Sequence, residues 1–193
     1  MGRIVVSQFV TLDGVMEDPG GSEGFERGGW AFEFDRGADG DRFKLEEVMA
    51  SGALLLGRVT YEGFAAAWPS RSGEFADKFN AMPKFVVSRT LERPEWNNTN
   101  VIRGDLRGAV ERLRAEVDGD VLVNGSATLM AALMDEGLVD EYRLMVFPAV
   151  LGAGKRLFPE THDPASLRVV SATTAADVVI LVLVPRAAGE SGR

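Results

Sequence analysis

Two segments of the sequence join an apolar, strand-like run through a glycine to a helix-like run. The first is Leu54-Leu55-Leu56-Gly57-Arg58-Val59-Thr60, and the second is Val121-Leu122-Val123-Asn124-Gly125-Ser126-Ala127-Thr128. The free amides and the dipole of a helix N-terminus suit an anion, and glycine lets backbone approach a phosphate closely. Arg58, Ser126 and Thr128 add side-chain donors. Each junction therefore predicts either a phosphate site or a glycine that serves packing alone.

A hydroxyl and a guanidinium follow a third apolar run, at Ser88-Arg89-Thr90. This pair suits an isolated phosphomonoester. The common phosphate motifs are missing, because no Gly-x-Gly-x-x-Gly follows the first strand and Gly152-Ala153-Gly154-Lys155-Arg156 lacks the first glycine and the Ser/Thr of a P-loop. No metal-ligand spacing appears either, so we expect no metal site.

An aromatic side chain could serve a flat substrate. Trp30 follows Gly28-Gly29 inside a long Gly-, Asp- and Glu-rich segment, residues 11–40. Long loops in compact domains are usually lids or binding loops, with a disordered insertion as the alternative. Trp30 could stack on a ring in such a loop. It could equally belong to a short strand packed on the core, since Trp30, Phe32 and Phe34 alternate.

Composition limits the chemistry further. The 193 residues include no cysteine and one histidine, which excludes thiolate sites, disulfides and multi-histidine metal sites. The formal net charge of −8 makes nucleic acid and anionic membranes poor partners. No apolar run is long enough to span a bilayer, and the N-terminal residues lack a signal-peptide pattern, so we expect a cytosolic protein.

The elements that must position these groups alternate between strands and helices, which is the α/β pattern. We expect strands at 3–10, 53–56, 84–88, 100–102, 120–123 and 142–147, and helices at 41–50, 58–60, 106–117 and 126–134. Two further runs, 167–172 and 178–184, look like a closing antiparallel pair. The prediction is one α/β domain over residues 1–185, with a mixed sheet of about eight strands and helices on both faces, and a flexible tail at 186–193.

In this order the motifs resemble the dihydrofolate reductase superfamily, especially the branch of the riboflavin-biosynthesis reductase domain. The resemblance covers residues 3–184, nearly the whole chain. It rests on Ser7-x-x-x-x-Leu12-Asp13-Gly14, Leu56-Gly57-Arg58-x-Thr60-Tyr61, Val87-Ser88-Arg89-Thr90, Val123-Asn124-Gly125-Ser126, Leu138-Val139-Asp140-Glu141 and Pro148-x-x-Leu151-Gly152-x-Gly154. It implies a dihydrofolate-reductase-like fold and a homodimer. It also implies NADPH-dependent hydride transfer to a heterocyclic or ribosylaminopyrimidine-type substrate, as in 5-amino-6-(5-phosphoribosylamino)uracil reductase.

By position, the resemblance assigns the cofactor to three groups of residues. The cofactor phosphates would bind Gly57, Arg58 and Thr60; the 2′-phosphate would bind Ser88 and Arg89; and the pyrophosphate would bind Gly125, Ser126, Ala127 and Thr128. The family usually has a glycine pair where this chain has Asn124-Gly125, so an unusual backbone at this turn would strain a residue other than glycine.

The resemblance also suggests the catalytic and substrate-side groups. The loop at residues 12–16 would border the nicotinamide, which makes Asp13 the leading polar group beside the substrate, unless it only shapes the turn before Gly14. Asp41 lies at the matching distance before Gly57 for the proton-donating acid, with helix capping as the alternative. Trp30 remains the candidate ring-stacking residue. The alternative to a stand-alone reductase is a non-catalytic nucleotide-binding or assembly protein that keeps the fold.

Overall fold

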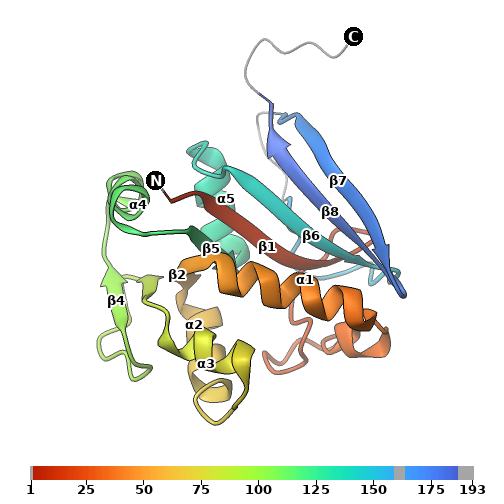
Figure 1. The fold of residues 1–193 in the computed structure, drawn as a ribbon, viewed down its shortest axis with the longest axis horizontal. Coiled ribbons are helices and arrows are strands. Elements are labelled where there is room, and N and C mark those ends of the chain that lie inside the picture. The colour runs from red at the N-terminus through yellow and green to blue at the C-terminus, as the bar shows by residue number, and fades with distance from the viewer. Residues whose placement is uncertain (1, 159–163, 187–193) are drawn as a thin grey trace.

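A computed structural model describes residues 2–158 and 164–186. Its eight strands form one sheet in the order β4-β3-β2-β5-β1-β6-β8-β7 (Figure 1). Each strand except β8 runs parallel to the others, and β8 pairs antiparallel with β6 and β7. The strands are β1 (Ile4–Thr11), β2 (Ser51–Gly57), β3 (Lys84–Val87), β4 (Thr99–Ile102), β5 (Asp120–Asn124), β6 (Glu141–Phe147), β7 (Leu167–Ala175) and β8 (Val178–Pro185). The predicted mixed sheet with a closing antiparallel pair is confirmed.

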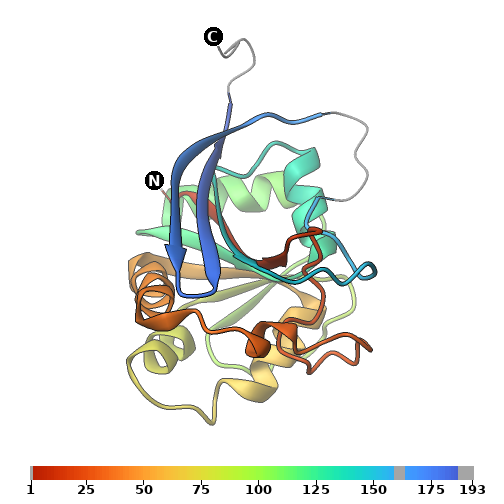
Figure 2. The ribbon, with the colours of Figure 1, turned by 90° about the vertical axis from the view of Figure 1, so that its right-hand side faces the viewer.

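Helices cover both faces of the sheet, as Figure 2 shows. On one face lie α1 (Gly37–Ala50), α2 (Arg58–Ala67) and α3 (Glu74–Ala81), and on the other lie α4 (Leu106–Glu116) and α5 (Ala127–Asp135). The central strands β2 and β5 are buried on both faces, which explains their continuous apolar runs. No helix in the described ranges is long and apolar enough to cross a membrane.

Three local predictions were wrong. The first long helix begins at Gly37 rather than Asp41, so Asp41 lies inside α1 and does not cap it. Residues 30–33 form a short 3-10 helix rather than a strand. The sequence interpretation also missed α3, whose two turns bury only Ala76 and Phe79 fully. The expected flexible tail falls mostly on residues 187–193, which lie outside the described residues.

The long segment between β1 and α1 is an ordered loop. The carboxylate of Asp18 accepts hydrogen bonds from the amides of Ser22, Glu23 and Phe25. The indole of Trp30 donates to the Glu17 carbonyl at 2.9 Å. These bonds give the loop a defined internal structure, which excludes the disordered-insertion alternative.

A fully buried lysine, Lys84, begins β3. It should make the free energy of unfolding depend on pH in the alkaline range. Lys84 Nζ donates to the Asn80 carbonyl and lies 4.2 Å from the ring centroid of Trp96. Burial lowers the pKa of Lys84 from 10.5 to about 8. Between these two values the unfolded chain binds more protons, so the free energy of unfolding rises as pH rises.

We expect Lys84→Met to remove this rise. Urea unfolding between about pH 7 and about pH 10 measures it, because the window lies below the raised pKa of Tyr142, about 12. Lys78→Met, at a more exposed lysine on α3, is the control. Equal pH slopes in Lys84→Met and the wild type would contradict the expectation.

Candidate functional site

The two strand–glycine–helix junctions lie side by side, because β2 and β5 are neighbouring parallel strands. A Cβ added at Gly57 would collide with the side chain of Ser126, and one added at Gly125 would collide with Thr60. Close approach of the two junctions therefore requires both glycines, as the packing alternative proposed. The same packing brings the N-termini of α2 and α5 together at the carboxyl edge of the sheet.

The backbone at the second junction is left-handed at two successive residues, Gly125 (φ 66°) and Ser126 (φ 60°). The strained residue other than glycine at this turn is thus Ser126. Residues with a side chain adopt this left-handed conformation only at some cost in free energy. Ser126 caps α5 by accepting from the Leu129 amide at 3.3 Å. The helix geometry leaves the amides of Ala127 and Thr128 without an intrahelical partner.

A substitution pair tests the contact between the junctions. We expect Gly57→Ala to lower the free energy of unfolding by about 1–3 kcal/mol, because the new methyl group overlaps Ser126. Ser126→Gly removes the overlapped atoms, so the double variant should lose less than the sum of the single changes. Urea unfolding of all four proteins gives this coupling. Additive losses would show that the two junctions do not touch.

Guanidinium groups follow three adjacent strands at the same edge: Arg58 after β2, Arg89 after β3 and Arg103 after β4. Arg103 donates to the Arg89 carbonyl at 3.2 Å and to the Leu91 carbonyl at 2.6 Å, which shapes the turn after β3. Arg58 is ion-paired with Glu62 at 2.8 Å. The sequence interpretation missed Arg103, although the strand it expected at 100–102 ends immediately before it.

The hydroxyl of Ser88 accepts hydrogen bonds from the amides of Thr90 and Leu91, so it orders the same turn. Arg89 and Thr90 are exposed beside it. The arrangement at the end of β3 therefore has the donors that the sequence prediction required there.

A cavity of about 890 Å³ lies beside these junctions, bounded by α1, α2, α3 and the loop after β1. Among the predicted residues, Asp41, Thr60, Gly125, Ser126, Ala127 and Thr128 line it. The described lining does not include Gly57, Arg58, Ser88, Arg89, Asp13 or Trp30. The phosphate-type residues are thus divided between the cavity wall and the sheet edge outside it.

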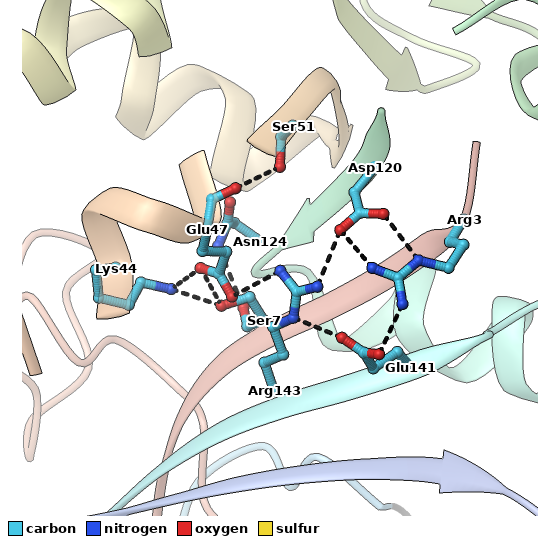
Figure 3. Close-up of polar contacts among 9 residues, drawn as sticks. All are labelled: Arg3, Ser7, Lys44, Glu47, Ser51, Asp120, Asn124, Glu141 and Arg143. Carbon is cyan, nitrogen blue, oxygen red and sulfur yellow. Dashed lines mark hydrogen bonds and ion pairs between the residues drawn. The ribbon is translucent and has the colours of Figure 1, made fainter. Parts of the chain in front are cut away.

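At the base of the cavity is a group that the sequence interpretation missed, here called the polar floor: Ser7, Lys44, Glu47 and Asn124 (Figure 3). The Ser7 hydroxyl donates to Glu47 Oε2 at 2.8 Å, and the Lys44 ammonium reaches both. The Glu47 side chain is only 1% exposed. Within the described residues, Glu47 Oε1 and Asn124 Oδ1 are buried without a hydrogen-bond partner, which leaves acceptor capacity at the floor.

The polar floor is held by the strands on either side of Ser7. In the sheet register Ser7 on β1 lies opposite Asn124 on β5 and Arg143 on β6. Arg143 Nη1 lies 3.9 Å from Glu47 Oε1, and its other nitrogens bind Asp120 and Glu141 at 2.9 and 2.6 Å. Figure 3 shows this chain of charges running from the floor to Arg3. Through Arg143, this network helps to hold the Glu47 carboxylate in place.

Asp41 lies inside α1 and does not cap the helix. Its side chain is 64% exposed and is ion-paired with Arg36 at 2.6 Å. It lines the cavity from the exposed side of α1. Two less exposed titratable groups of α1 also line the cavity, the partly buried Lys44 and the buried Glu47, about one turn and two turns further along the helix.

Asp13 is bound within its own turn. Its carboxylate accepts from the Thr11 hydroxyl at 2.5 Å and from the amides of Gly152 and Leu151 at 2.8 and 3.2 Å. These donors, Thr11 first, lower the pKa of Asp13. The contacts are those of the turn-shaping alternative.

Trp30 belongs to the core, and the ring-stacking interpretation was wrong. It is 2% exposed and packs edge-on against Phe147 at 5.3 Å. The neighbouring Phe32, 81% exposed, lines the cavity instead. The residues of this segment do not alternate as a strand because they form a 3-10 turn.

Comparisons with known proteins agree with this architecture. The model of the RibD C-terminal domain matches residues 3–181. The uncharacterized protein YyaP of Bacillus subtilis is 26% identical over 186 residues, covering 94% of this chain and 93% of its own length.

Two solved structures show the same fold. RibD of Acinetobacter baumannii has a TM-score of 0.64 at 17% identity, covering 97% of this chain and 59% of that one. Dihydrofolate reductase of Enterococcus faecalis, in complex with NADP(H) and RAB-propyl, has a TM-score of 0.63 at 13% identity, covering 96% of this chain and 98% of that one.

Proposed function

Because the chain belongs to the RibD C-terminal domain family, we propose that it is an NADPH-dependent reductase. Its substrate would be a heterocyclic or ribosylaminopyrimidine-type compound. The observation that carries the proposal is the shared position of two helix N-termini, three guanidinium groups and a cavity with a buried polar floor. All of them lie at the carboxyl edge of the parallel strands, where open α/β sheets bind ligands.

The residues present fit the phosphates of NADPH. The amides of Ala127 and Thr128, together with those of Val59 and Thr60, open onto the cavity and would hold the pyrophosphate. Ser88, Arg89 and Arg103 would hold the 2′-phosphate that distinguishes NADPH from NADH. When bound, the nicotinamide supplies a hydride. Gly57 contributes by allowing the two helix ends to meet.

The polar floor would complete the reduction on the substrate side. Hydride addition to a polarised double bond leaves negative charge on the heteroatom, which must receive a proton. The Lys44 ammonium is a partly buried donor at the floor of the cavity, and Ser7 and Glu47 orient it. The substrate thus gains one hydride and one proton, and water can restore the proton to Lys44 through the open side of the cavity.

Thermal unfolding with NADPH, NADH, FMN and no ligand tests the proposal. At about 100 times its dissociation constant a ligand adds about 2.7 kcal/mol, which raises the midpoint of a domain this size by about 5–10 °C. We expect such a rise with NADPH and a small one with NADH. No rise with either nicotinamide would exclude the reductase and leave the non-catalytic alternative, whereas a rise with FMN alone would indicate a flavin protein.

We also propose that the chain forms a homodimer through its outer strand. β7 lies at the edge of the sheet, with Val169 and Val170 exposed, while the more apolar β8 is an interior strand. Exposed apolar edge strands pair readily with another chain. We expect a dimer in sedimentation analysis of the wild type and a monomer for Val169→Asp. A wild-type monomer would contradict this.

A further inference from the structure

One side of the cavity is an aromatic wall, made of Phe64, Trp68, Phe75 and Phe79 from α2 and α3. Trp68 and Phe75 are stacked with ring centroids 5.2 Å apart, and Trp68 and Phe79 are 4.7 Å apart. Leu45 and Val48 of α1 line the same cavity. Such a surface suits the face of a flat ring, because aromatic contacts add to the burial of apolar area.

Apart from the helix N-termini that would hold the cofactor pyrophosphate, the charged groups that line the cavity do not suit a phosphorylated substrate. Its basic residues are Arg36, Lys44, Arg71 and Lys155, and its acidic residues are Glu17, Asp18, Glu23, Asp41, Glu47 and Glu74. Three of the four cations are already paired with carboxylates. The fourth, Arg71, stacks over Trp68 at 4.6 Å. A phosphate dianion entering here would meet an excess of negative charge.

Arginine side chains that could bind phosphate are present at the same edge of the sheet, but outside the cavity. Arg58, Arg89 and Arg103 gather at the ends of β2, β3 and β4, and none of them lines the cavity. These three arginines therefore lie outside the cavity, on the side where the 2′-phosphate of the cofactor would bind. The substrate side has aromatic rings and a polar floor.

From this division we propose that the cavity takes an uncharged, flat aromatic compound, with its ring on the aromatic wall and its polar edge on the floor, and that it rejects phosphorylated analogues. The inference rests on the proposed function and narrows its substrate class. Of the two substrate classes in the proposed function, it favours an uncharged heterocyclic compound over a phosphorylated ribosylaminopyrimidine.

Calorimetric titration with 1-naphthol and 1-naphthyl phosphate tests this, because the two probes share a ring and differ by the phosphate. We expect 1-naphthol to bind at least about tenfold more tightly. Equal or tighter binding of the phosphate ester would overturn the proposal, particularly if Arg71→Ala then abolished it.

Two substitutions locate the binding. Phe75→Ala should weaken 1-naphthol binding by about three- to tenfold; should it fail to fold, Phe75→Leu keeps apolar volume and removes the ring. Glu74→Lys reverses an exposed charge beside Phe75. It should reduce the difference in affinity between 1-naphthol and 1-naphthyl phosphate. Unchanged 1-naphthol binding in folded Phe75 variants would overturn the assignment to this wall.

These titrations need no cofactor, so their failure is distinct from failure of the reductase proposal. NADPH stabilisation together with preferred binding of the phosphate ester would leave the reductase standing and remove only the substrate class. Preferred binding of 1-naphthol without stabilisation by NADPH would support the uncharged substrate class and remove the reductase proposal.

Discussion

The double variant Arg89→Ala/Arg103→Ala is expected to bind NADPH about 100-fold more weakly than the wild type, with little change for NADH. Hydrogen bonds to charged groups contribute about 1.5–3 kcal/mol each, which is roughly tenfold or more in affinity for each arginine. Arg89 and Arg103 lie together at the ends of β3 and β4, and Arg103 also holds the turn that carries Arg89. Only the 2′-phosphate of NADPH would engage them.

Calorimetric titration of both nucleotides measures this difference. Arg112→Ala is the matched control, because it removes the same charge from an exposed site on α4. The single variants separate direct binding by Arg89 from support by Arg103. Equal losses for NADPH and NADH would contradict a 2′-phosphate site at this edge.

Lys44→Met is expected to lower the free energy of unfolding by about 3 kcal/mol, because it leaves the buried Glu47 carboxylate without its main partner. Arg143, 3.9 Å from the other oxygen of Glu47, limits the loss. NADPH should still raise the unfolding midpoint of the variant, since the phosphate residues are elsewhere. Substrate reduction should fall, because the proton donor is gone.

A second substitution distinguishes loss of the ion pair from loss of packing. Lys44→Met/Glu47→Gln has no buried charge at the floor, and the amide can still bond Ser7, so most of the lost stability should return. Arg42→Met on the exposed side of α1 is the control and should change stability by about 0.5 kcal/mol or less. A loss in the double variant as large as in Lys44→Met would show that the charge of Glu47 is not the cause.

Much of the fold follows from local patterns. The apolar runs at 53–56 and 120–123 have the composition of buried parallel strands, and both lie at the centre of the sheet. Asp105, which immediately precedes the helix expected at 106–117, caps α4 through the Gly108 amide. The start of α1 could not be predicted in this way, because Gly37 and Arg36 provide no side-chain cap. The short α3 has Phe75 and Phe79 one turn apart, but its eight residues leave only about two turns in which a helical period can repeat.

The site was only partly predictable for a related reason. Junction residues such as Gly57 and Ser126 are signalled by a glycine between a strand and a helix, which is a local pattern. The polar floor joins Ser7, Glu47 and Asn124 across more than 110 residues, and each alone looks like an ordinary polar residue. Asp41 was suggested as the acid by its distance from Gly57, but α1 begins four residues earlier than expected, and the Asp41 side chain is exposed and paired with Arg36. The two alternatives for Trp30 could not be separated from the sequence, because its burial depends on Phe147 in a distant strand.

Amide chemical shifts report directly on whether the N-termini of α2 and α5 hold the cofactor pyrophosphate, as proposed. Titration with NADPH should shift the resonances of Thr60, Ala127 and Thr128 most strongly, together with those around Ser88 and Arg89. NADH should shift the first set and leave the second nearly unchanged. Shifts confined to other parts of the chain, such as β7 and β8, or no shifts at saturating NADPH, would contradict the account.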